Sequence, residues 1–331
     1  MRPILFLIAL LLATLPALAQ SPSERIATID FYGYGHLDVA SLRAALPIKE
    51  GDRIPSDKVR ESATRAVSGV AGRQAVISGV CCRPDGRSSM YVGLREVGAV
   101  PVAYNPAPQG TVRLSADVLR IFQQFDKHFT DAVKRGASRE DDSQGYALFD
   151  DPASHADQLK LRTWTRAHTA LVLRVLAESS DAGQRAYAAQ ALGYADRSPE
   201  QIAALVAAAF DSDDEVRNNA VRALEVLCAV GSEVTTRIPA DRFVPLLHSI
   251  SWTDRNKGSV LFSRMTESRD PALLKLLHDQ AIEPLREMAQ WKDIGHAQTS
   301  LVILGRIAGI DEKRLEQLDA SVAAEILRTA R

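Results

Sequence analysis

Two stretches of the chain decide its fold: residues 213–224 read DDEVRNNAVRAL, and residues 181–192 read DAGQRAYAAQAL. They align without a gap, 32 residues apart. In each, small and apolar residues recur at helical spacing after an aspartate that can cap the first turn. The segment between them has a second apolar face, formed by Ile202, Leu205, Val206 and Ala209. One repeat is therefore a pair of helices, and neighbouring pairs must stack to bury their apolar stripes.

Weaker copies of this unit continue toward the C-terminus. Residues 255–258 (RNKG) follow the pattern of residues 217–220 (RNNA). We therefore predict an α-solenoid of helical pairs over residues 115–331, with an exposed polar loop at 136–153. The pattern leaves open how regular the pairs are after residue 232.

The motif Asp-x-x-Val-Arg-x-x-Ala-x-x-Ala-Leu, complete at 213–224, resembles HEAT repeats and their variant described as PBS-lyase HEAT-like. The resemblance implies structural roles for the residues that carry it, which are Asp181, Arg185, Leu192, Asp213, Arg217 and Leu224. We expect Asp213 to cap its helix, because an aspartate accepts hydrogen bonds from the free N–H groups of a first turn. We expect Arg217 to pair with acids of the adjacent repeat.

A small α+β domain is predicted at residues 20–97, followed by a proline-rich linker at 98–114. Alternating apolar residues indicate its strands, and apolar residues three and four apart indicate its helices. The expected elements, in the order β-α-α-β-β, are residues 26–32, 38–46, 55–68, 74–82 and 89–96. A tight turn at Pro84-Asp85-Gly86 joins the last two strands as a hairpin.

This order resembles the POTRA domain of bacterial envelope proteins. The resemblance is carried by Ile26, Ile29, Phe31 and Gly33, by Leu42 and Leu46, by Lys49-Glu50-Gly51-Asp52, and by Val92, Leu94 and Glu96. It implies a domain that pairs a sheet edge with another polypeptide. The unpaired backbone groups of an edge strand make such pairing physically reasonable.

The N-terminal 19 residues have the pattern of a Sec-type signal peptide. Arg2 precedes an apolar run at 4–15, and Ala17-Leu18-Ala19 offers a cleavage site before Gln20. The run is shorter than the roughly 18–20 residues that a membrane-spanning helix needs. We therefore expect an exported protein of the periplasm, or alternatively a secreted one, with no membrane span after cleavage.

The charge composition of the chain limits the classes of molecule that it can bind. The chain has 40 basic and 41 acidic residues, so it lacks the basic surplus with which nucleic-acid binders displace counterions. We therefore expect another protein as the partner, and no nucleic acid.

The side chains of Cys81 and Cys82 would point to opposite faces of a strand. We favour free thiols, and leave open a disulfide from Cys228 to the N-terminal domain.

Motifs for catalysis, for cofactors and for metals are missing from the sequence, and none of the seven histidines has a partner at i+4. We therefore expect no catalytic residues, no cofactor and no metal. Residues 252–257 (WTDRNK) and 287–297 (EMAQWKDIGHA) resemble segments of a group of exported HEAT-repeat proteins of environmental bacteria. From these segments we select a candidate protein-binding set: Asp254, Arg255, Asn256, Lys257, Glu287, Trp291 and His296.

Two functions remain in competition. The first is a non-catalytic protein-interaction module or scaffold, acting as a cell-envelope adaptor or assembly factor. The alternative is a HEAT-like lyase-type enzyme that acts on a protein or a small ligand. A deep pocket that gathers His296, Glu287 and Asp254 would favour the enzyme, since a Glu-His pair can perform acid-base chemistry. A broad groove without convergent acids would favour binding. The sequence leaves open the partner's identity, the oligomeric state and the rigidity between the two domains.

Overall fold

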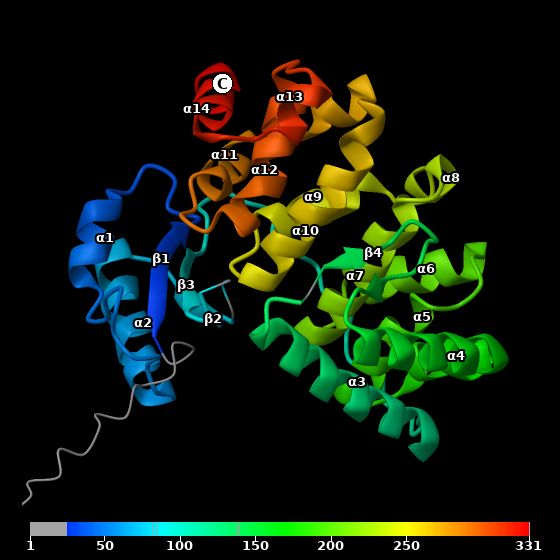
Figure 1. Ribbon diagram of the computed structural model, residues 1–331. Helices are drawn as coiled ribbons and strands as arrows, with labels where there is room; N and C mark the ends of the chain where they lie inside the picture. The colour runs from blue at the N-terminus through cyan, green and yellow to red at the C-terminus, as the bar shows by residue number, and fades with distance from the viewer. Residues whose placement is uncertain (1–24, 82, 84, 138, 331) are drawn as a thin grey trace, which may run out of the picture.

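The computed structural model describes residues 25–81, 83, 85–137 and 139–330 (Figure 1). The predicted signal peptide at residues 1–19 and Cys82 lie outside the described residues. The described chain forms a small α+β domain and a larger helical unit. None of its described helices combines the length and apolar character needed to cross a membrane.

The α+β domain has the predicted element order. It consists of β1 (Ile26–Tyr32), α1 (Val39–Ala45), α2 (Asp57–Ala71), β2 (Ala75–Val80) and β3 (Ser88–Leu94). The strands lie in the order β1-β3-β2. The central strand β3 is parallel to β1 and forms an antiparallel hairpin with β2.

Both faces of this small sheet are covered. Alternate strand residues such as Phe31 and Val92 pack with Leu42 of α1 and Val67 of α2 in one apolar core. On the opposite face, Tyr32 and Tyr91 belong to the core of the helical unit. Figure 1 shows the two helices on the outer side of the sheet and the repeats on the inner side. This arrangement explains why every residue of β3 is buried.

The helical unit stacks its pairs in two rows. The first row contains α5 (Ala182–Leu192), α7 (Asp214–Cys228), α10 (Trp252–Met265) and α12 (Ile294–Ile307), each in contact with the next. The second row contains α6 (Pro199–Ala208), α9 (Ala240–Leu247), α11 (Pro271–Ala289) and α14 (Ala320–Thr329). In each of the last three pairs a short segment separates the two helices along the chain. These segments are α8 (Ser232–Thr235), a 3₁₀ turn at Thr266–Ser268, and α13 (Glu312–Glu316). The paired arrangement therefore continues past residue 232.

Two long helices precede the repeats. They are α3 (Ala116–Lys134) and α4 (Pro152–Glu178), and α4 is kinked at His168. The exposed loop expected at 136–153 is wrong in part, because the chain forms a small hairpin of β4 (Glu140–Asp141) and β5 (Leu148–Phe149). Leu148 and Phe149 are buried. Two strands of this length produce too short an alternation to be recognised in the sequence.

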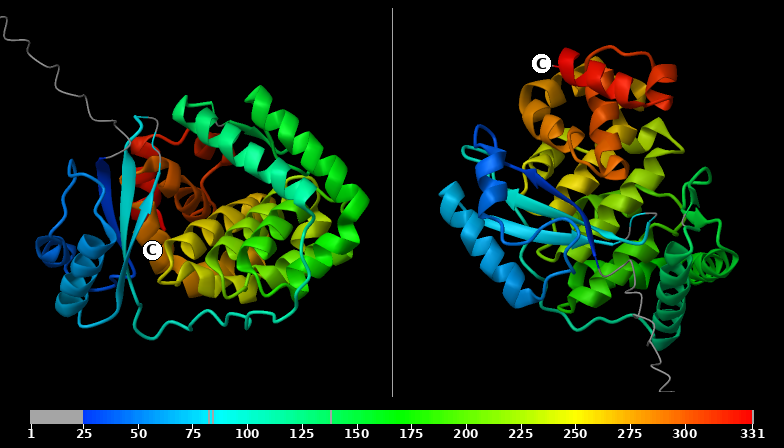
Figure 2. Two further views of the ribbon diagram at one scale, coloured as in Figure 1. Left: turned by 90° about the horizontal axis from the view of Figure 1, so that it is seen from below. Right: turned by 60° about the vertical axis from the view of Figure 1, so that its left-hand side comes forward.

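The linker crosses the edge of the solenoid instead of separating the two domains. Residues 98–114 contain no helix. The backbone N–H of Asn105 donates to the carbonyl of Phe210 at 2.6 Å, and the N–H of Gly110 donates to that of Glu178 at 2.8 Å. Figure 2 shows this segment running along the helical unit from the sheet to α3. The linker therefore binds the turns of successive repeats in reverse order.

The cysteines differ from the expectation. Cys81 is disulfide-bonded, so the prediction of free thiols is wrong for this residue. Cys228 is free and buried on α7, which rules out the disulfide that was left open between Cys228 and the N-terminal domain. Burial raises the pKa of the Cys228 thiol to about 11, so it remains protonated at neutral pH.

Candidate functional site

Buried arginines connect neighbouring repeats. The Arg185 guanidinium donates to both carboxylate oxygens of Asp211 at 2.8 Å. Arg217, at the equivalent position of the next repeat, donates to Asp254 at 2.8 Å. Asp213 caps α7 by accepting from the backbone N–H groups of Glu215 and Val216. Arg217 and Asp213 thus form an ion pair to the next repeat and a helix cap, respectively.

The third arginine of this series, Arg255, pairs with an acid outside the repeats. Arg255 is fully buried and donates to the carbonyl of Ser249 at 2.7 Å. Its charge is met by Glu96, which follows β3, and Glu287 lies 3.6 Å away. The N-terminal domain therefore supplies the carboxylate that residues of the chain's own repeats supply to Arg185 and Arg217. Glu96 also shares a hydrogen bond with His248, so it joins the two units at two points.

Glu287 and Trp291 hold the end of β1. The carboxylate of Glu287 accepts from the backbone N–H groups of Gly33 and Gly35, the latter at 2.8 Å. The indole of Trp291 donates to the carbonyl of Phe31 at 3.3 Å. Burial raises the pKa of Glu287, and the Arg255 guanidinium and the two N–H groups partly offset this rise. These contacts fix the first strand against the repeats.

Tyr91 is the centre of an aromatic cluster in the seam between the units. Its ring stacks on Trp252 at 5.3 Å and lies 4.8 Å from the ring of Trp291. Its hydroxyl shares a hydrogen bond with Nδ1 of His296. Burial lowers the pKa of His296, so the imidazole is neutral at neutral pH. Nearby, burial raises the pKa of Asp30 to about 6, although the backbone N–H of Lys292 donates to it.

The structure gives most of the candidate protein-binding residues partners within the chain. Asp254 accepts from the hydroxyl of the linker residue Tyr104, and Arg255, Glu287, Trp291 and His296 contact the N-terminal domain as described above. Asn256 is buried. The acid-base residues are thus held in separate contacts and do not converge on one pocket. Of this set, only Lys257 lines the open groove that we take as the candidate site in the described part of the chain.

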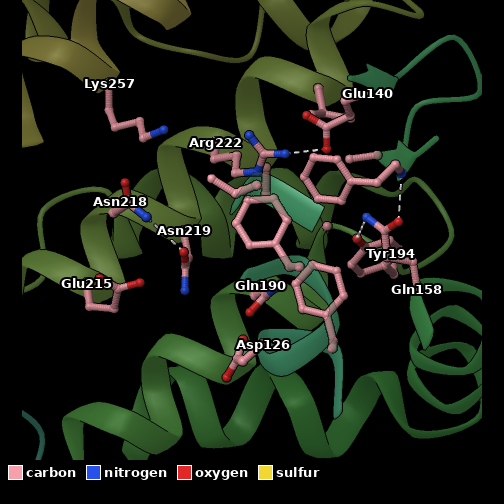
Figure 3. A pocket seen from close by; sticks show the side chains of 18 of the residues that line it. Asp126, Glu140, Gln158, Gln190, Tyr194, Glu215, Asn218, Asn219, Arg222 and Lys257 are labelled. Carbon is pink, nitrogen blue, oxygen red and sulfur yellow. Dashed lines mark hydrogen bonds and ion pairs between the residues drawn. The ribbon is translucent and has the colours of Figure 1, made fainter. Parts of the chain in front are cut away.

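The groove has a volume of about 540 Å³ on the first-row face, between α3 and the helices α5, α7 and α10. Its apolar wall is formed by Phe125, Phe129, Val133, Ala147, Phe149 and Val226. Its polar wall is formed by Gln190, Glu215, Asn218, Asn219, Arg222 and Lys257. Figure 3 shows these side chains around the groove. Cys81, beyond the end of β2, also lines it, so the N-terminal domain contributes to the site.

Charged groups of both signs face the groove. Burial and the Arg222 guanidinium lower the pKa of the Lys257 ammonium to about 8. Desolvation raises the pKa of Glu215, with a further contribution from the neighbouring acids Asp214 and Asp213. Arg222 forms an ion pair with Glu140 of β4. The groove therefore combines a lysine whose charged form is disfavoured, the Arg222–Glu140 ion pair, and the carboxylate of Glu215.

Sequence reasoning missed most of the groove. Glu215, Asn218, Asn219 and Arg222 follow one another at i, i+3, i+4 and i+7 on α7, a polar stripe that could have been recognised beside the apolar one. Their function was hidden because the facing wall comes from α3 and from the unpredicted β4–β5 hairpin.

The fold defines an α-helical repeat protein of the solenoid class. More particularly, a family model described as HEAT repeats matches residues 169–254, which contain the two repeats recognised in the sequence. No curated protein matches the chain.

Three designed or engineered proteins are among the similar solved structures. An engineered protein has 18% identity and a TM-score of 0.39, with 65% of this chain and 95% of that chain covered. A designed armadillo repeat protein has 14% identity and a TM-score of 0.38, with 55% and 93% covered. A computationally designed armadillo repeat protein for modular peptide recognition has 16% identity and a TM-score of 0.39, with 64% and 98% covered.

Proposed function

We propose that the chain is a non-catalytic protein-binding scaffold of the cell envelope, acting as an adaptor or assembly factor, and that the groove beneath α3 receives its partner. The observation that carries this proposal is the open groove of about 540 Å³, with one apolar and one polar wall. Such a combination of apolar surface and a few directed polar groups is typical of ligand sites.

The repeat geometry favours an extended polypeptide in this groove. Gln190, Asn218 and Lys257 line it from the three consecutive first-row helices α5, α7 and α10. Packed helices lie about 8–10 Å apart, so these three residues offer two amides and an ammonium in successive steps along the stack. An extended chain advances about 3.3 Å per residue. A segment of roughly six residues would therefore cross all three helices.

The contacts of the candidate acid-base residues support a non-catalytic role. Asp254, Glu287 and His296 each serve the attachment of the linker or the N-terminal domain. The alternative of a HEAT-like lyase-type enzyme therefore gains no support from them.

Two observations support export to the periplasm. The first 19 residues have the pattern of a cleaved signal peptide, and Cys81 is disulfide-bonded, as is common in oxidising compartments. The test is the mass of the chain recovered from a periplasmic extract. We expect a chain that begins at Gln20. A full-length chain confined to the cytoplasm would contradict export.

A POTRA-like role of the N-terminal domain forms part of the same proposal. Its element order and its β1-β3-β2 arrangement support the assignment. Since the repeats cover one face of the sheet, a partner would have to approach at a strand edge.

The binding proposal can be tested by site-specific photo-crosslinking in the full mature chain. A photoreactive residue replaces Asn219 in the groove, and a matched control carries it at Glu200, which is exposed on α6. We expect a discrete polypeptide adduct from envelope extracts at position 219 only. The absence of a polypeptide adduct there, or equal adducts at both positions, would contradict the proposal.

A further inference from the structure

Lys257 is a cation without a counterion at the end of the groove. It lies on α10, and its side chain is half-buried. Among the described residues, no carboxylate lies within ion-pair distance of its ammonium group, whereas most other buried or half-buried cations of the repeats have such a partner. Figure 3 shows the ammonium pointing toward Arg222 of α7. Two cations thus lie next to each other on the polar wall of the groove.

We propose that Lys257 and Arg222 form a carboxylate-binding site, and that the groove takes a polypeptide segment in which a large apolar side chain adjoins a carboxylate group. The inference rests on the proposed function and specifies the chemistry of the polypeptide. A carboxylate between the two cations would pair with Lys257 and would relieve the repulsion from Arg222.

Arg222 retains the capacity to join such a site. Its contact with Glu140 uses one terminal nitrogen, Nη2, and a guanidinium has five N–H donors in a planar fork. Within the described chain, no second acceptor pairs with this guanidinium. Its Cζ atom also lies 5.9 Å from the ring centre of Phe149. Arg222 is therefore positioned by Glu140 and Phe149, with further donors available to a ligand.

The charge of the groove favours a carboxylate over a phosphate. Its carboxylates are those of Asp126, Glu140 and Glu215, and its cations are Arg222 and Lys257. A single negative charge can be matched at the cationic end. A phosphate near two charges would also meet the field of three carboxylates, which opposes a dianion.

The apolar wall beside this end specifies the neighbouring side chain. The rings of Phe125 and Phe129 stack with centres 5.8 Å apart, and the rings of Phe129 and Phe149 lie 4.7 Å apart. Such a surface suits an aromatic or large aliphatic side chain. The amides of Gln190, Asn218 and Asn219 line the same groove. Asn218 donates to Oδ1 of Asn219, and Asn219 donates to the carbonyl of Ala186. In the described part of the chain this leaves the Gln190 amide and Oδ1 of Asn218 for peptide groups. A polypeptide therefore fits better than a free acid, which would leave the amides unused.

Four short peptides test the inference by calorimetric titration of the full mature chain at pH 7. Ac-Gly-Ser-Phe-Phe-OH and its C-terminal amide differ only in a terminal carboxylate. Ac-Gly-Ser-Phe-Asp-amide and Ac-Gly-Ser-Phe-Asn-amide differ only in a side-chain carboxylate. We expect at least one acidic peptide to bind tenfold or more tightly than its neutral counterpart, and the pair that shows the difference identifies the source of the carboxylate. Equal affinities within both pairs would overturn the inference.

The variant Lys257→Gln assigns the preference to this site. We expect it to abolish the difference within the responding pair, because the acidic peptide loses the ammonium that its carboxylate pairs with. The matched control is Lys127→Gln on α3, whose side chain is 72% exposed and pairs with Asp131, and it should retain the preference. A preference that survives in Lys257→Gln would overturn the inference, and the neutral peptide reports whether the variant groove is intact.

A further titration and the photo-crosslinking result separate the remaining outcomes. If 3-phenylpropionate binds as tightly as the acidic peptide, the ligand class is a small amphipathic acid, and the inference of a polypeptide is wrong. If a polypeptide adduct forms at position 219 but neither peptide pair shows a carboxylate preference, the inference fails while the proposed function stands.

Discussion

Arg185, Arg217 and Arg255 occupy one position in three consecutive repeats, and each is buried. Each also donates to the backbone carbonyl six residues earlier, which closes the turn before its own helix. What differs is the carboxylate that each arginine meets. The hydrogen bond from the arginine to its own turn is thus repeated in all three repeats, whereas the carboxylate that pairs with the arginine differs in each.

Replacing Arg217 with alanine should strongly destabilise the protein. Asp254 would remain buried with only neutral donors, from Ser249 and Tyr104. Breaking a buried pair by removing one partner costs about 3–5 kcal/mol. The measurement is the free energy of unfolding in urea. The control is Arg166→Ala, which removes an exposed contact to Asp196 and should cost at most about 1 kcal/mol. Equal losses would contradict the structural role assigned to Arg217.

The carboxylate preference should decline above pH 8. The pKa of Lys257 is lowered to about 8 in the free chain, and a bound carboxylate raises it because the charged form is favoured. Binding above pH 8 therefore requires proton uptake, and affinity should fall by up to about tenfold per pH unit. Titrations of the acidic peptide at pH 7 and pH 9 measure this fall. An unchanged affinity would contradict the role of the ammonium.

The groups that act on the ammonium from the neighbouring elements are Arg222, Glu215 and Glu225 of α7, Glu140 of β4 and His296 of α12. The raised pKa of Arg222 keeps its guanidinium protonated, and the lowered pKa of His296 keeps its imidazole neutral in this interval. The same titrations of Lys257→Gln assign the change between pH 7 and pH 9 to the ammonium, since this variant should not show it.

Elements with a repeated local pattern could be predicted from the sequence. The helices α5 and α7 follow from their shared motif, and the order of the N-terminal elements follows from alternation and turn residues. The hairpin β4–β5 could not be predicted, because two-residue strands are stabilised by packing of Phe149 against the aromatic residues of α3. The groove was missed for the same reason, since one of its walls has no local signature.

The turn after β1 offers an element-scale test. Gly33 and Gly35 both have positive φ, at 69° and 55°. A Cβ on Gly33 would lie 2.1 Å from the carbonyl oxygen of Leu94, whereas a Cβ on Gly35 would meet nothing within 4 Å. We expect Gly35→Ala to cost roughly 1 kcal/mol from backbone strain alone, and Gly33→Ala to cost clearly more. Thermal unfolding of both variants measures this, and a larger loss in Gly35→Ala would contradict the described turn.

At the scale of the whole molecule, the two predicted domains share one seam. Tyr91, Trp252 and Trp291 meet there, although they are far apart in the sequence. No periodicity links such residues, so the seam could not be predicted from local pattern. The polar segments chosen as a binding surface were unusual in composition because they hold the N-terminal domain, a role that composition alone does not distinguish from binding another protein.

Removal of the N-terminal domain should expose this seam. A chain that begins at residue 98 would leave Trp252 and Trp291 without Tyr91 and would leave Arg255 without Glu96. We expect a lower melting temperature and stronger binding of a hydrophobic dye than in a chain that begins at residue 24. Dye fluorescence and thermal unfolding of the two chains test this. Identical behaviour would show that the domains are energetically independent.

The attachment of the N-terminal sheet to the last repeats has a consequence for the order of synthesis. The N-terminal domain leaves the ribosome first, yet its sheet is completed by Trp291 and His296, which are made about two hundred residues later. Until then the tyrosine-bearing face of the sheet has no cover. Contacts so distant in sequence also form slowly. The nascent chain thus exposes the aromatic surface of Tyr32 and Tyr91 for most of its translation. A chaperone or a protease that binds this surface would act on incomplete chains and not on the folded protein.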